Sequence, residues 1–526
     1  MKVLAIHAIG HDTGVALYEN ERLIYFMETE RLTRRRYDHR VLLTVRHVLS
    51  VNGIGIDDID LVALSTPIND NVISVRNKES VMCKLARKTL THVMTTCDIM
   101  GATRPCMVVT HEASHAMLAV HYGGYCSPML VLVNEGQGQF SQNALFLYDE
   151  GTLTWIDSDM LPWYGRGLGW TGIGVLFGMG NSPGVAGKLM AMSGYGSHQH
   201  DVEQRLREIE DRVTTDREYA WETARVLADE NFLHKGEFQR KADIVATFQR
   251  MFTDSVVKLV SNRMKESQIA RLGVSGGCGL NIVTNTALRD IGILPSIPPS
   301  CNDSGHALGL GSYVYAVAGA GQLEEFSVYS VGESESDQEC SDALIAAGLS
   351  VESFDADVVA RTLAEGGVVA FAQGRSECGP RALGNRSLLA SPVVPGMKRR
   401  VSEKLKNREW YRPLATVVPW ELGQSEFGML TPSPYMLYNY DVRADIIPEA
   451  THVDGTCRLQ TFEPQDNPRL GSVVMNFTQL TGTPGVINTS LNSGGRAISL
   501  KMDDVLTDFS GLDVDLFVMN DVMGKK

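Results

Sequence analysis

Two histidines, His111 and His115, stand four residues apart in the stretch THEASHAMLAVHYGG, residues 110–124. If this stretch is helical, the two side chains share one face and both imidazoles can point at one metal ion. The letters also match the His-Glu-x-x-His pattern of zinc proteases, in which Glu112 is the general base. Two polar side chains on a helix surface would explain the same spacing, so the pair alone does not distinguish a metal site from an exposed helix face.

A carboxylate that could complete such a site occurs in SCNDSGHALGLGSYVY, residues 300–315. Asp303 lies in a turn of small residues before a segment rich in Gly and Ala that we expect to be helical. Two histidines and one carboxylate with open coordination positions suit Fe(II) or a similar divalent ion. The alternative is that Asp303 caps the helix.

A glycine-rich loop, VSGGCGLN at residues 274–281, is predicted to join a strand to the start of a helix. Glycines let backbone N–H groups approach a phosphate, and the helix dipole favours the anion. The loop is not a Walker A motif, because no Gly-Lys-Ser/Thr follows. A plain glycine-rich turn is the alternative.

The last third of the chain carries cations within apolar strand-and-turn patterns. They lie in GRSECGPRALGNRSLLASP, KNREWYRPLATVVP and HVDGTCRLQT, and VINTSLNSGG adds hydroxyls and amides. Each cation could pair with an Asp or Glu. If several converge, they form a phosphate pocket, because guanidinium groups bind phosphate oxygens in pairs. The cations are Arg375, Arg381, Arg386, Lys406, Arg408, Arg412 and Arg458.

The elements that would position these residues follow from the hydrophobic pattern. Residues 2–9 read as a buried strand, and residues 15–32 read as a hairpin with its bend at 19–21. Residues 127–156 repeat this layout, which hints at internal duplication. A charged segment with helical periodicity, about 199–268, is predicted to be a helical insertion. A linker near 317–341 precedes a second unit that begins at about residue 342.

The composition narrows the class of protein. The chain has 526 residues, 44% hydrophobic and 21% charged, and a net charge of −14. The charge argues against a nucleic-acid partner. The nine cysteines form no Cys-x-x-Cys pair, which fits a reducing cytoplasm. No apolar run of about 18 residues occurs, so we expect no membrane span and a cytoplasmic protein.

Taken together and in order, these motifs resemble the O-carbamoyltransferase family of natural-product biosynthesis, which includes nodulation-factor, cephem, tobramycin and novobiocin-type enzymes. The resemblance covers most of the chain. Its motifs are GHDTGVALYENERLIYFMETERLTR, HEASHA, GKLMAMSGYG, SGGCGLN, NDSGHALG, CGPRALGNRSLLASP, KNREWYRPLA, THVDGTCRLQT and INTSLNSGG.

The resemblance implies an α/β protein of two domains. Residues 1–330 would form an actin-like ATPase (Kae1-like) domain that contains the insertion, and residues 342–526 a smaller YrdC-like α/β domain that binds carbamoyl phosphate. The implied reaction forms carbamoyl-adenylate from ATP and carbamoyl phosphate. The carbamoyl group then passes to a hydroxyl of a small-molecule acceptor.

The same resemblance implies roles for individual residues. His111, His115 and Asp303 would bind a divalent metal, commonly iron, with Mg²⁺ as a further ion, and Glu112 has no role. His11 would be the general base on the acceptor hydroxyl, and fixed cations would stabilise the negative charge of the reaction. Carbamoyl phosphate would be held by Arg381, Lys406, Arg412, Arg458 and Ser490, and ATP by Lys188, Gly276, Gly277 and Asn281.

One departure from the family is visible at the second hairpin turn. The family has Asp-Gly-x-Gly-acid there, whereas this chain has Glu135-Gly136-Gln137-Gly138-Gln139, which puts any catalytic or metal-linked role of the turn in doubt. Two other functions stay open. One is carbamoyl or threonylcarbamoyl transfer to a protein or tRNA, and the other is a non-enzymatic actin-like nucleotide switch. The aromatic, glycine-rich segment 160–180 is expected either to line an acceptor pocket or to form core. For the oligomeric state, the expectation is a homodimer.

Overall fold

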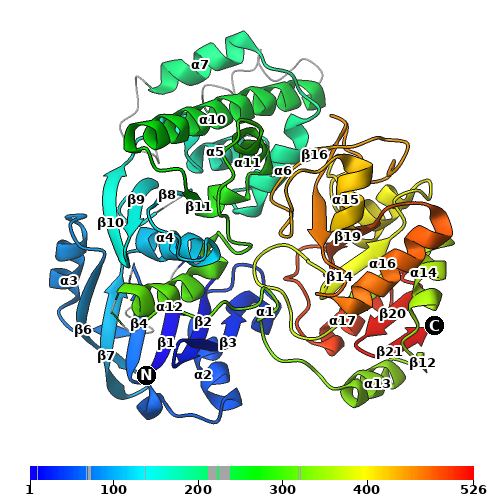
Figure 1. Cartoon of the computed structure of the whole chain (residues 1–526), viewed down its shortest axis with the longest axis horizontal. Coiled ribbons are helices and arrows are strands. Elements are labelled where there is room, and N and C mark those ends of the chain that lie inside the picture. The colour runs from blue at the N-terminus through cyan, green and yellow to red at the C-terminus, as the bar shows by residue number, and fades with distance from the viewer. Residues whose placement is uncertain are drawn as a thin grey trace. The chain divides into compact units, whose positions relative to one another are not determined.

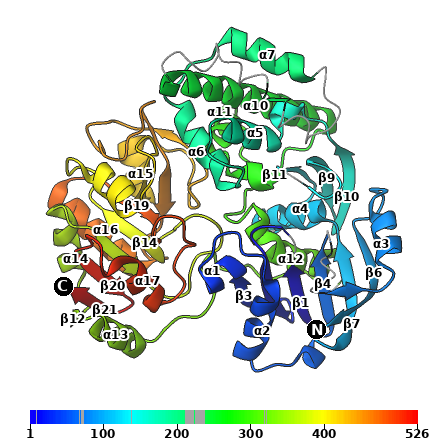
Figure 2. The same ribbon diagram turned by 180° about the vertical axis from the view of Figure 1, so that it is seen from behind.

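The computed structural model describes residues 1–526 except 9, 67, 69–72, 137, 211–221, 224, 226–236, 318, 320 and 526. It divides into two compact units (Figures 1 and 2). The first unit is Met1–Thr29 with Tyr37–Phe326, and the second is Glu30–Arg36 with Ser327–Lys526. The sequence led us to expect an unbroken first domain over 1–330. The structure instead assigns 30–36 and 327–330 to the second unit.

Two sheets make up the strand content of the first unit within the described residues. Their orders are β3-β2-β1-β4-β7-β6-β5 and β10-β9-β8-β11. The strands are β1 (Lys2–His7), β2 (Gly14–Glu19), β3 (Arg22–Glu28), β4 (Leu61–Ser65), β5 (Ser74–Val75), β6 (His92–Ile99), β7 (Ala102–Val109), β8 (Met129–Asn134), β9 (Asn143–Asp149), β10 (Thr152–Ser158) and β11 (Leu272–Ser275).

The two sheets share one motif. In each, an antiparallel three-stranded meander is followed by a parallel strand beside its first member: β4 pairs with β1, and β11 pairs with β8. The first hairpin turns through Asn20 and Glu21, both at positive φ, as a tight two-residue turn requires. Both predicted hairpins are therefore present, and the matching strand orders support the duplication suggested by the sequence.

Helices of the first unit cover and separate these sheets. They are α2 (Val41–Val51), η1 (Ile56–Asp58), α3 (Lys78–Leu85), α4 (His111–Tyr122), η2 (Trp163–Gly165), α5 (Leu168–Leu176), α6 (Gly184–Ser193), α7 (His200–Glu210), α10 (Glu237–Ser267), η3 (Gly277–Leu280), α11 (Ile282–Asp290), η4 (Asp303–Gly305) and α12 (His306–Val317). Helix α1 (Thr29–Thr33) lies across the boundary of the two units.

Helices α4 and α12 pack against each other. Helix α12 also packs on β1, β2 and β4, while α4 packs on β8, β9 and β11 (Figure 1). A glycine makes the close approach possible, because a Cβ on Gly309 would lie 2.1 Å from the carbonyl oxygen of Ser114. The first turns of both helices are thereby brought together.

Helices α7 and α10 belong to the segment expected to be a helical insertion at about 199–268. Phe248 and Phe252 of α10 pack on Trp170, and Phe248 also packs on Trp163. The aromatic residues of segment 160–180 are buried in these contacts, so Trp163 and Trp170 form core. Most of the connection between α7 and α10 lies outside the described residues.

The second unit is built on one large mixed sheet with the order β12-β21-β20-β13-β14-β19-β15-β18, and β16 pairs with β17. Helices α14 and α16 pack on each other and on the sheet through a core that includes Leu363, Phe371 and Phe477. The elements are α13 (Asp337–Ala346), β12 (Ser350–Ser353), α14 (Ala356–Ala364), β13 (Val369–Ala372), β14 (Arg386–Ala390), η5 (Arg399–Leu405), β15 (Ala415–Pro419), α15 (Trp420–Phe427), β16 (Tyr440–Asp441), β17 (Thr456–Cys457), β18 (Leu459–Phe462), α16 (Pro468–Thr481), β19 (Val486–Ser490), α17 (Met502–Phe509), β20 (Leu516–Met519) and β21 (Val522–Lys525).

The segment Glu30–Arg36 is joined to the second unit by arginine side chains. Nη2 of Arg31 donates to the carbonyl oxygen of Gly379 at 2.6 Å, and Arg34 pairs with Asp508 at 2.5 Å. Arg35 forms an isolated antiparallel bridge with Arg496. The mixed α/β class expected from the sequence is confirmed in both units. Within the described residues, no helix has the length and apolar character needed to cross a bilayer.

Arg386 has a structural role. Its guanidinium is fully buried and donates to the carbonyl oxygens of Gln373, Gly374, Asn385 and Leu500, at 2.7 to 3.0 Å. These carbonyls, and not an anion, satisfy this cation of the arginine-rich motif.

We expect Arg386→Ala to lower the free energy of unfolding by about 3 to 5 kcal/mol, because several buried carbonyls lose a charged donor. Urea unfolding followed by tryptophan fluorescence measures this. Arg443→Ala is the control, since Arg443 is exposed and forms an ion pair with Asp445, and it should change stability by less than about 0.5 kcal/mol. Equal stability of both variants would contradict the structural role.

His121, near the end of α4, gives a pH-dependent prediction. Its ring stacks on Phe326 with 4.2 Å between centroids, and burial lowers its pKa to about 4. Between pH 6.5 and 4 the unfolded chain therefore takes up a proton that the folded chain refuses, so stability falls as the pH falls. At pH 5 this residue should cost about 2 kcal/mol. His121→Phe keeps the stacked ring, and its loss of stability from pH 7 to pH 5 in urea unfolding should be smaller by that amount.

Candidate active site

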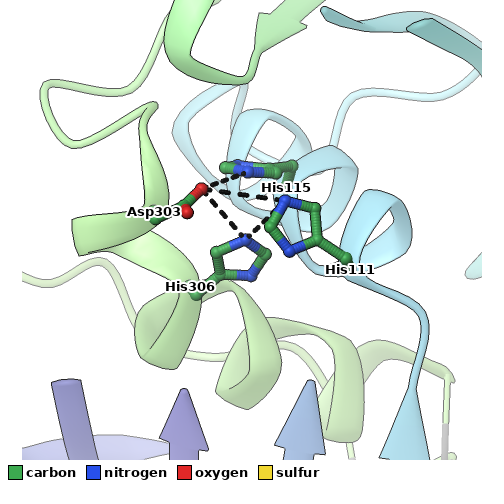
Figure 3. Close-up of side chains that lie close together, drawn as sticks. All are labelled: His111, His115, Asp303 and His306. Carbon is green, nitrogen blue, oxygen red and sulfur yellow. Dashed lines mark hydrogen bonds and ion pairs between the residues drawn. The ribbon is translucent and has the colours of Figure 1, made fainter. Parts of the chain in front are cut away.

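The histidine and aspartate residues singled out from the sequence meet at the first turns of α4 and α12. His111 is the first residue of α4, after the N-cap Thr110, and His115 follows one turn later on the same face. Asp303 begins η4, and His306 is the first residue of α12. Figure 3 shows the four side chains pointing toward one another.

Their ligand atoms all lie within 4.8 Å of one another, and the side chains are buried or nearly so. Oδ1 of Asp303 is 3.7 Å from Nε2 of His111, 3.3 Å from that of His115 and 3.6 Å from that of His306. Four groups of metal-ligand type therefore surround one small volume. We did not single out His306 from the sequence, although it lies three residues after Asp303.

The charges in this cluster are unevenly distributed. Burial opposes ionisation of Asp303, but the neighbouring His115 and His306 hold its pKa well below the usual range. Burial lowers the pKa of His111 to about 4 and that of His306 well below its usual value. These two imidazoles are neutral near pH 7 and keep a lone pair available for a cation.

Glu135 connects this cluster to the glycine-rich loop. Its Oε1 accepts from the backbone N–H of Gly277 at 2.6 Å and lies 2.8 Å from Nε2 of His115. Although burial disfavours the charged imidazole, Glu135 and Asp303 raise the pKa of His115 to about 9. The longer acid at the altered turn therefore reaches both the histidine and aspartate cluster and the glycine-rich loop.

Three of the four residues expected to contact ATP, Gly276, Gly277 and Asn281, belong to this loop. Gly276 has φ of 92°, and a Cβ there would lie 2.3 Å from the carbonyl oxygen of Asn134, so only glycine fits. The side chain of Asn281 accepts from the N–H of Thr284 and caps α11. Lys188 is half-buried on α6. The N–H of Gly277 is bonded to Glu135, and contact of these residues with ATP stays a prediction.

His11 lies in the turn between β1 and β2 and is half-exposed. Its Nδ1 is 3.2 Å from Oδ2 of Asp12 and 3.7 Å from Oδ2 of Asp303. Burial opposes its charge, but Asp12 and Asp303 outweigh this effect and raise its pKa to about 9. A general base must be neutral, so this role requires that positive charge nearby compensate Asp303.

Glu112 is directed toward a loop. Its Oε1 accepts from the backbone N–H groups of Phe140 at 2.6 Å and Ser141 at 3.0 Å. The side chain is fully buried, and burial raises its pKa. Glu112 therefore holds the end of the turn after β8, which is a structural role that sequence reasoning missed.

The second unit brings the expected carbamoyl-phosphate residues into one cationic cluster, which we define as Arg36, Arg381, Lys406, Arg408, Arg412 and Arg458. Burial and the charges of Arg381 and Arg408 lower the pKa of Arg458, and Nε of Arg458 is buried with no hydrogen-bond partner among the described residues. Because a guanidinium stays charged near pH 7, the shift reflects burial of a charge among other cations, which a bound anion would compensate.

The contacts of individual members differ. Lys406 is buried, and its Nζ donates to Ser490 and Asn492, including Oδ1 of Asn492 at 2.7 Å. Arg408 donates to the hydroxyls of Thr489 at 3.1 Å and Ser490 at 3.2 Å. Arg412 lies 3.5 Å from Glu409. Arg408 and Arg36 were not assigned to the site from the sequence.

Comparison with known proteins decides the family. The model of the carbamoyltransferase N-terminus matches residues 2–311, and that of the carbamoyltransferase C-terminus matches residues 360–526. The chain belongs to the carbamoyltransferase family. It is therefore an enzyme, and the family resemblance expected from its motifs is confirmed.

Relatives of this carbamoyltransferase cover nearly the whole chain. The nodulation protein NolNO of Sinorhizobium fredii is 29% identical over 98% of this chain and 79% of its own length. The 3'-hydroxymethylcephem-O-carbamoyltransferase of Amycolatopsis lactamdurans is 30% identical over 94% of both chains, and that of Streptomyces clavuligerus is 30% identical over 97% of both.

Solved structures resemble the carbamoyltransferase only distantly. The activator of the 2-hydroxyisocaproyl-CoA dehydratase from Clostridium difficile aligns with a TM-score of 0.36 and 12% identity, over 61% of this chain and 96% of its own. Full-length HypF aligns with a TM-score of 0.33 and 14% identity, over 60% of this chain and 55% of its own. At this distance, the fold is described by its own strand order.

Proposed function

We propose that this carbamoyltransferase is a cytoplasmic enzyme that uses ATP and carbamoyl phosphate to carbamoylate a hydroxyl group of a small-molecule natural product. The names of the two cephem relatives, which denote O-carbamoyl transfer to a hydroxymethyl group, support this acceptor class. The route would run through carbamoyl-adenylate, and the carbamoyl group would be passed on with release of AMP.

The mass balance of that route defines what the site must bind. Water cleaves carbamoyl phosphate to carbamate and inorganic phosphate. A carbamate oxygen then attacks the α-phosphorus of ATP, and pyrophosphate leaves. Finally the acceptor hydroxyl loses its proton and attacks the carbamoyl carbon, and AMP leaves. Each step moves negative charge between small oxyanions, which fixed cations stabilise.

The observation that carries the proposal is the cationic cluster of the second unit. Burial, and after it the mutual repulsion of the cluster's members, lowers the pKa of Lys406, Arg408 and Arg458. Carbamoyl phosphate is a small dianion that would compensate this charge. We assign its binding to Arg381, Lys406, Arg412, Arg458 and Ser490, as expected from the family, and add Arg408.

The chemistry of the donor set at α4 and α12 fits a divalent ion. Imidazoles with one or more carboxylates suit Fe²⁺ and similar ions, whereas Mg²⁺ prefers oxygen ligands and would accompany the ATP phosphates. His111, His115 and Asp303 would hold the ion, which as a Lewis acid would draw charge from phosphate oxygens. His11 would accept the proton of the acceptor hydroxyl.

A partial-reaction assay tests the proposal. Purified protein is incubated with ATP, carbamoyl phosphate and Fe²⁺ without an acceptor. Carbamoyl-adenylate is then sought by mass spectrometry and pyrophosphate release is measured. We expect the adenylate to form and pyrophosphate release to depend on carbamoyl phosphate. ATP hydrolysis that ignores carbamoyl phosphate would contradict the proposal and favour the nucleotide switch. Transfer of the carbamoyl group to tRNA or protein, and not to hydroxylated small molecules, would favour an enzyme that acts on a macromolecule.

A further inference from the structure

We propose that His306 is a fourth protein ligand of the divalent ion, beside His111, His115 and Asp303. The inference rests on the metal site of the proposed function and extends it. His306 begins α12 and is fully buried. Its ring faces the same volume as the rings of α4 (Figure 3).

The hydrogen bonds of Ser114 determine which nitrogen of His306 carries the proton. The hydroxyl of Ser114 donates to the carbonyl oxygen of His111 at 2.9 Å, so its oxygen must accept from its second partner, Nδ1 of His306. Nδ1 of His306 is therefore protonated, and Nε2 keeps its lone pair. A hydrogen bond of this kind on the far nitrogen is a regular feature of metal-binding histidines.

Ser275 lies beside His115 in a similar position, at longer distances. Its hydroxyl donates to the carbonyl oxygen of Cys301 at 3.3 Å, and its oxygen lies 3.5 Å from Nδ1 of His115. Nε2 of His115 then also faces the centre of the cluster. Ser114 thus orients the ring of His306, and Ser275 lies on the corresponding side of His115.

The surroundings of Nε2 of His306 call for a cation. The atom lies 3.6 Å from Oδ1 of Asp303 and 3.3 Å from Nε2 of His111. Nε2 of His306 and Oδ1 of Asp303 both present lone pairs, and these repel each other unless a positive charge lies between them. Hydrogen bonds to nitrogen usually measure about 2.7 to 3.2 Å, and these separations are longer.

The distances agree instead with the edges of a coordination shell. Metal–nitrogen and metal–oxygen bonds of about 2.1 Å place tetrahedral ligands about 3.4 Å apart. The three imidazoles lie 3.3, 3.6 and 3.7 Å from Oδ1 of Asp303, and His306 lies 3.3 Å from His111. One ion at the centre would satisfy all four.

His7 keeps the ring of His306 in place. The two rings stack with centroids 4.3 Å apart and an interplanar angle of 16°, and Nδ1 of His7 contacts Oγ of Ser65 at 2.7 Å. The stack and the Ser114 contact leave His306 little rotational freedom. His7 is therefore a positioning residue for this ligand.

The fourth ligand changes the character of the site. Three imidazoles and one carboxylate favour Fe²⁺, Co²⁺ or Zn²⁺ over Mg²⁺, because nitrogen ligands suit these transition metals. They also leave fewer open positions than two imidazoles and one carboxylate. We therefore expect the ion to be retained through purification and to offer few positions to substrate oxygens.

Titration of the metal-free full chain with Co²⁺ tests the assignment without any activity measurement. Visible absorbance reports the ligand set, and competition with a chelator gives the Kd. His306→Asn keeps a donor near Ser114 but no atom at the Nε2 position, and we expect it to weaken Co²⁺ binding at least about 100-fold and to change the spectrum. Ser114→Ala should weaken binding about 10-fold or more. His121→Phe, a buried histidine variant on the same helix, should leave both readouts unchanged.

The outcomes separate this inference from the function on which it rests. If His306→Asn binds Co²⁺ within about threefold of the unaltered chain and with the same spectrum, while His111→Ala does not bind, His306 is only a hydrogen-bond partner of His111 and the inference is overturned. The metal site would then survive. If the unaltered chain binds no Co²⁺, both fail. Thermal unfolding of each variant checks the fold, and Ser114→Ala decides the matter if His306→Asn is unfolded.

Discussion

Replacing Arg458 by alanine is expected to reduce carbamoyl-phosphate-dependent pyrophosphate release by about 10² to 10³-fold, the usual cost of losing one fixed charge-stabilising donor. The guanidinium lies within the cationic cluster, and its buried Nε has no hydrogen-bond partner among the described residues. The fold should not suffer, because removing one of several repelling charges relieves strain in the protein without ligand. Steady-state kinetics with carbamoyl phosphate as the varied substrate measure the effect.

Two variants make the Arg458 result specific. Arg458→Lys keeps the charge but not the paired N–H geometry, and it should recover only part of the activity. Arg443→Ala removes an exposed arginine from the same unit and should leave the kinetics unchanged. An Arg458→Ala enzyme with normal dependence on carbamoyl phosphate would place the binding of this substrate elsewhere.

Asp303→Asn is expected to have the second large effect. Oδ1 of Asp303 lies within 3.7 Å of three imidazole nitrogens, and the carboxylate supplies the negative charge among them. The amide is isosteric but neutral, so we expect divalent-metal affinity to fall at least about 100-fold and adenylate formation to fall with it. Elemental analysis of the purified variant, together with the partial-reaction assay, measures both quantities.

The matched control for this substitution is Asp157→Asn, which neutralises a partly exposed aspartate of the same unit that pairs with Arg263. It should retain metal and activity. If Asp303→Asn kept its metal but lost activity, Asp303 would act through His11, whose Nδ1 lies 3.7 Å from its other oxygen. Excess Fe²⁺ in the assay distinguishes these cases, because it would restore an enzyme that has only lost affinity.

Local pattern was enough to predict the strands and turns that carry the candidate site. The two hairpins follow from alternating and continuous apolar runs with polar bends, and the i, i+4 spacing of His111 and His115 was correctly interpreted as one helix face. The sequence around Asp303 also indicated a further candidate ligand, His306, which was not predicted. A helix that begins at His306 keeps this residue within one turn of Asp303.

Other features depend on packing that the sequence does not encode locally. Glu112 gained a role only when the loop after β8 folded back to its carboxylate. Trp163 and Trp170 became core because Phe248 and Phe252 of α10 pack on them, and nothing in the composition of segment 160–180 distinguishes a core from a pocket. The approach of α12 to α4 depends on the absence of a side chain at Gly309, which can be recognised only when both helices are in place.

Glu30–Arg36 has a practical consequence for recombination between relatives. These seven residues are encoded far from the rest of the second unit, yet Arg31 and Arg34 are bonded to Gly379 and Asp508 within it. A hybrid gene with a single crossover near codon 327 would take residues 30–36 from one parent and the rest of the second unit from the other. In such a hybrid, Arg31 and Arg34 would face a second unit from a different enzyme. Exchange of domains in this family should succeed more often when Glu30–Arg36 and the C-terminal half come from the same parent.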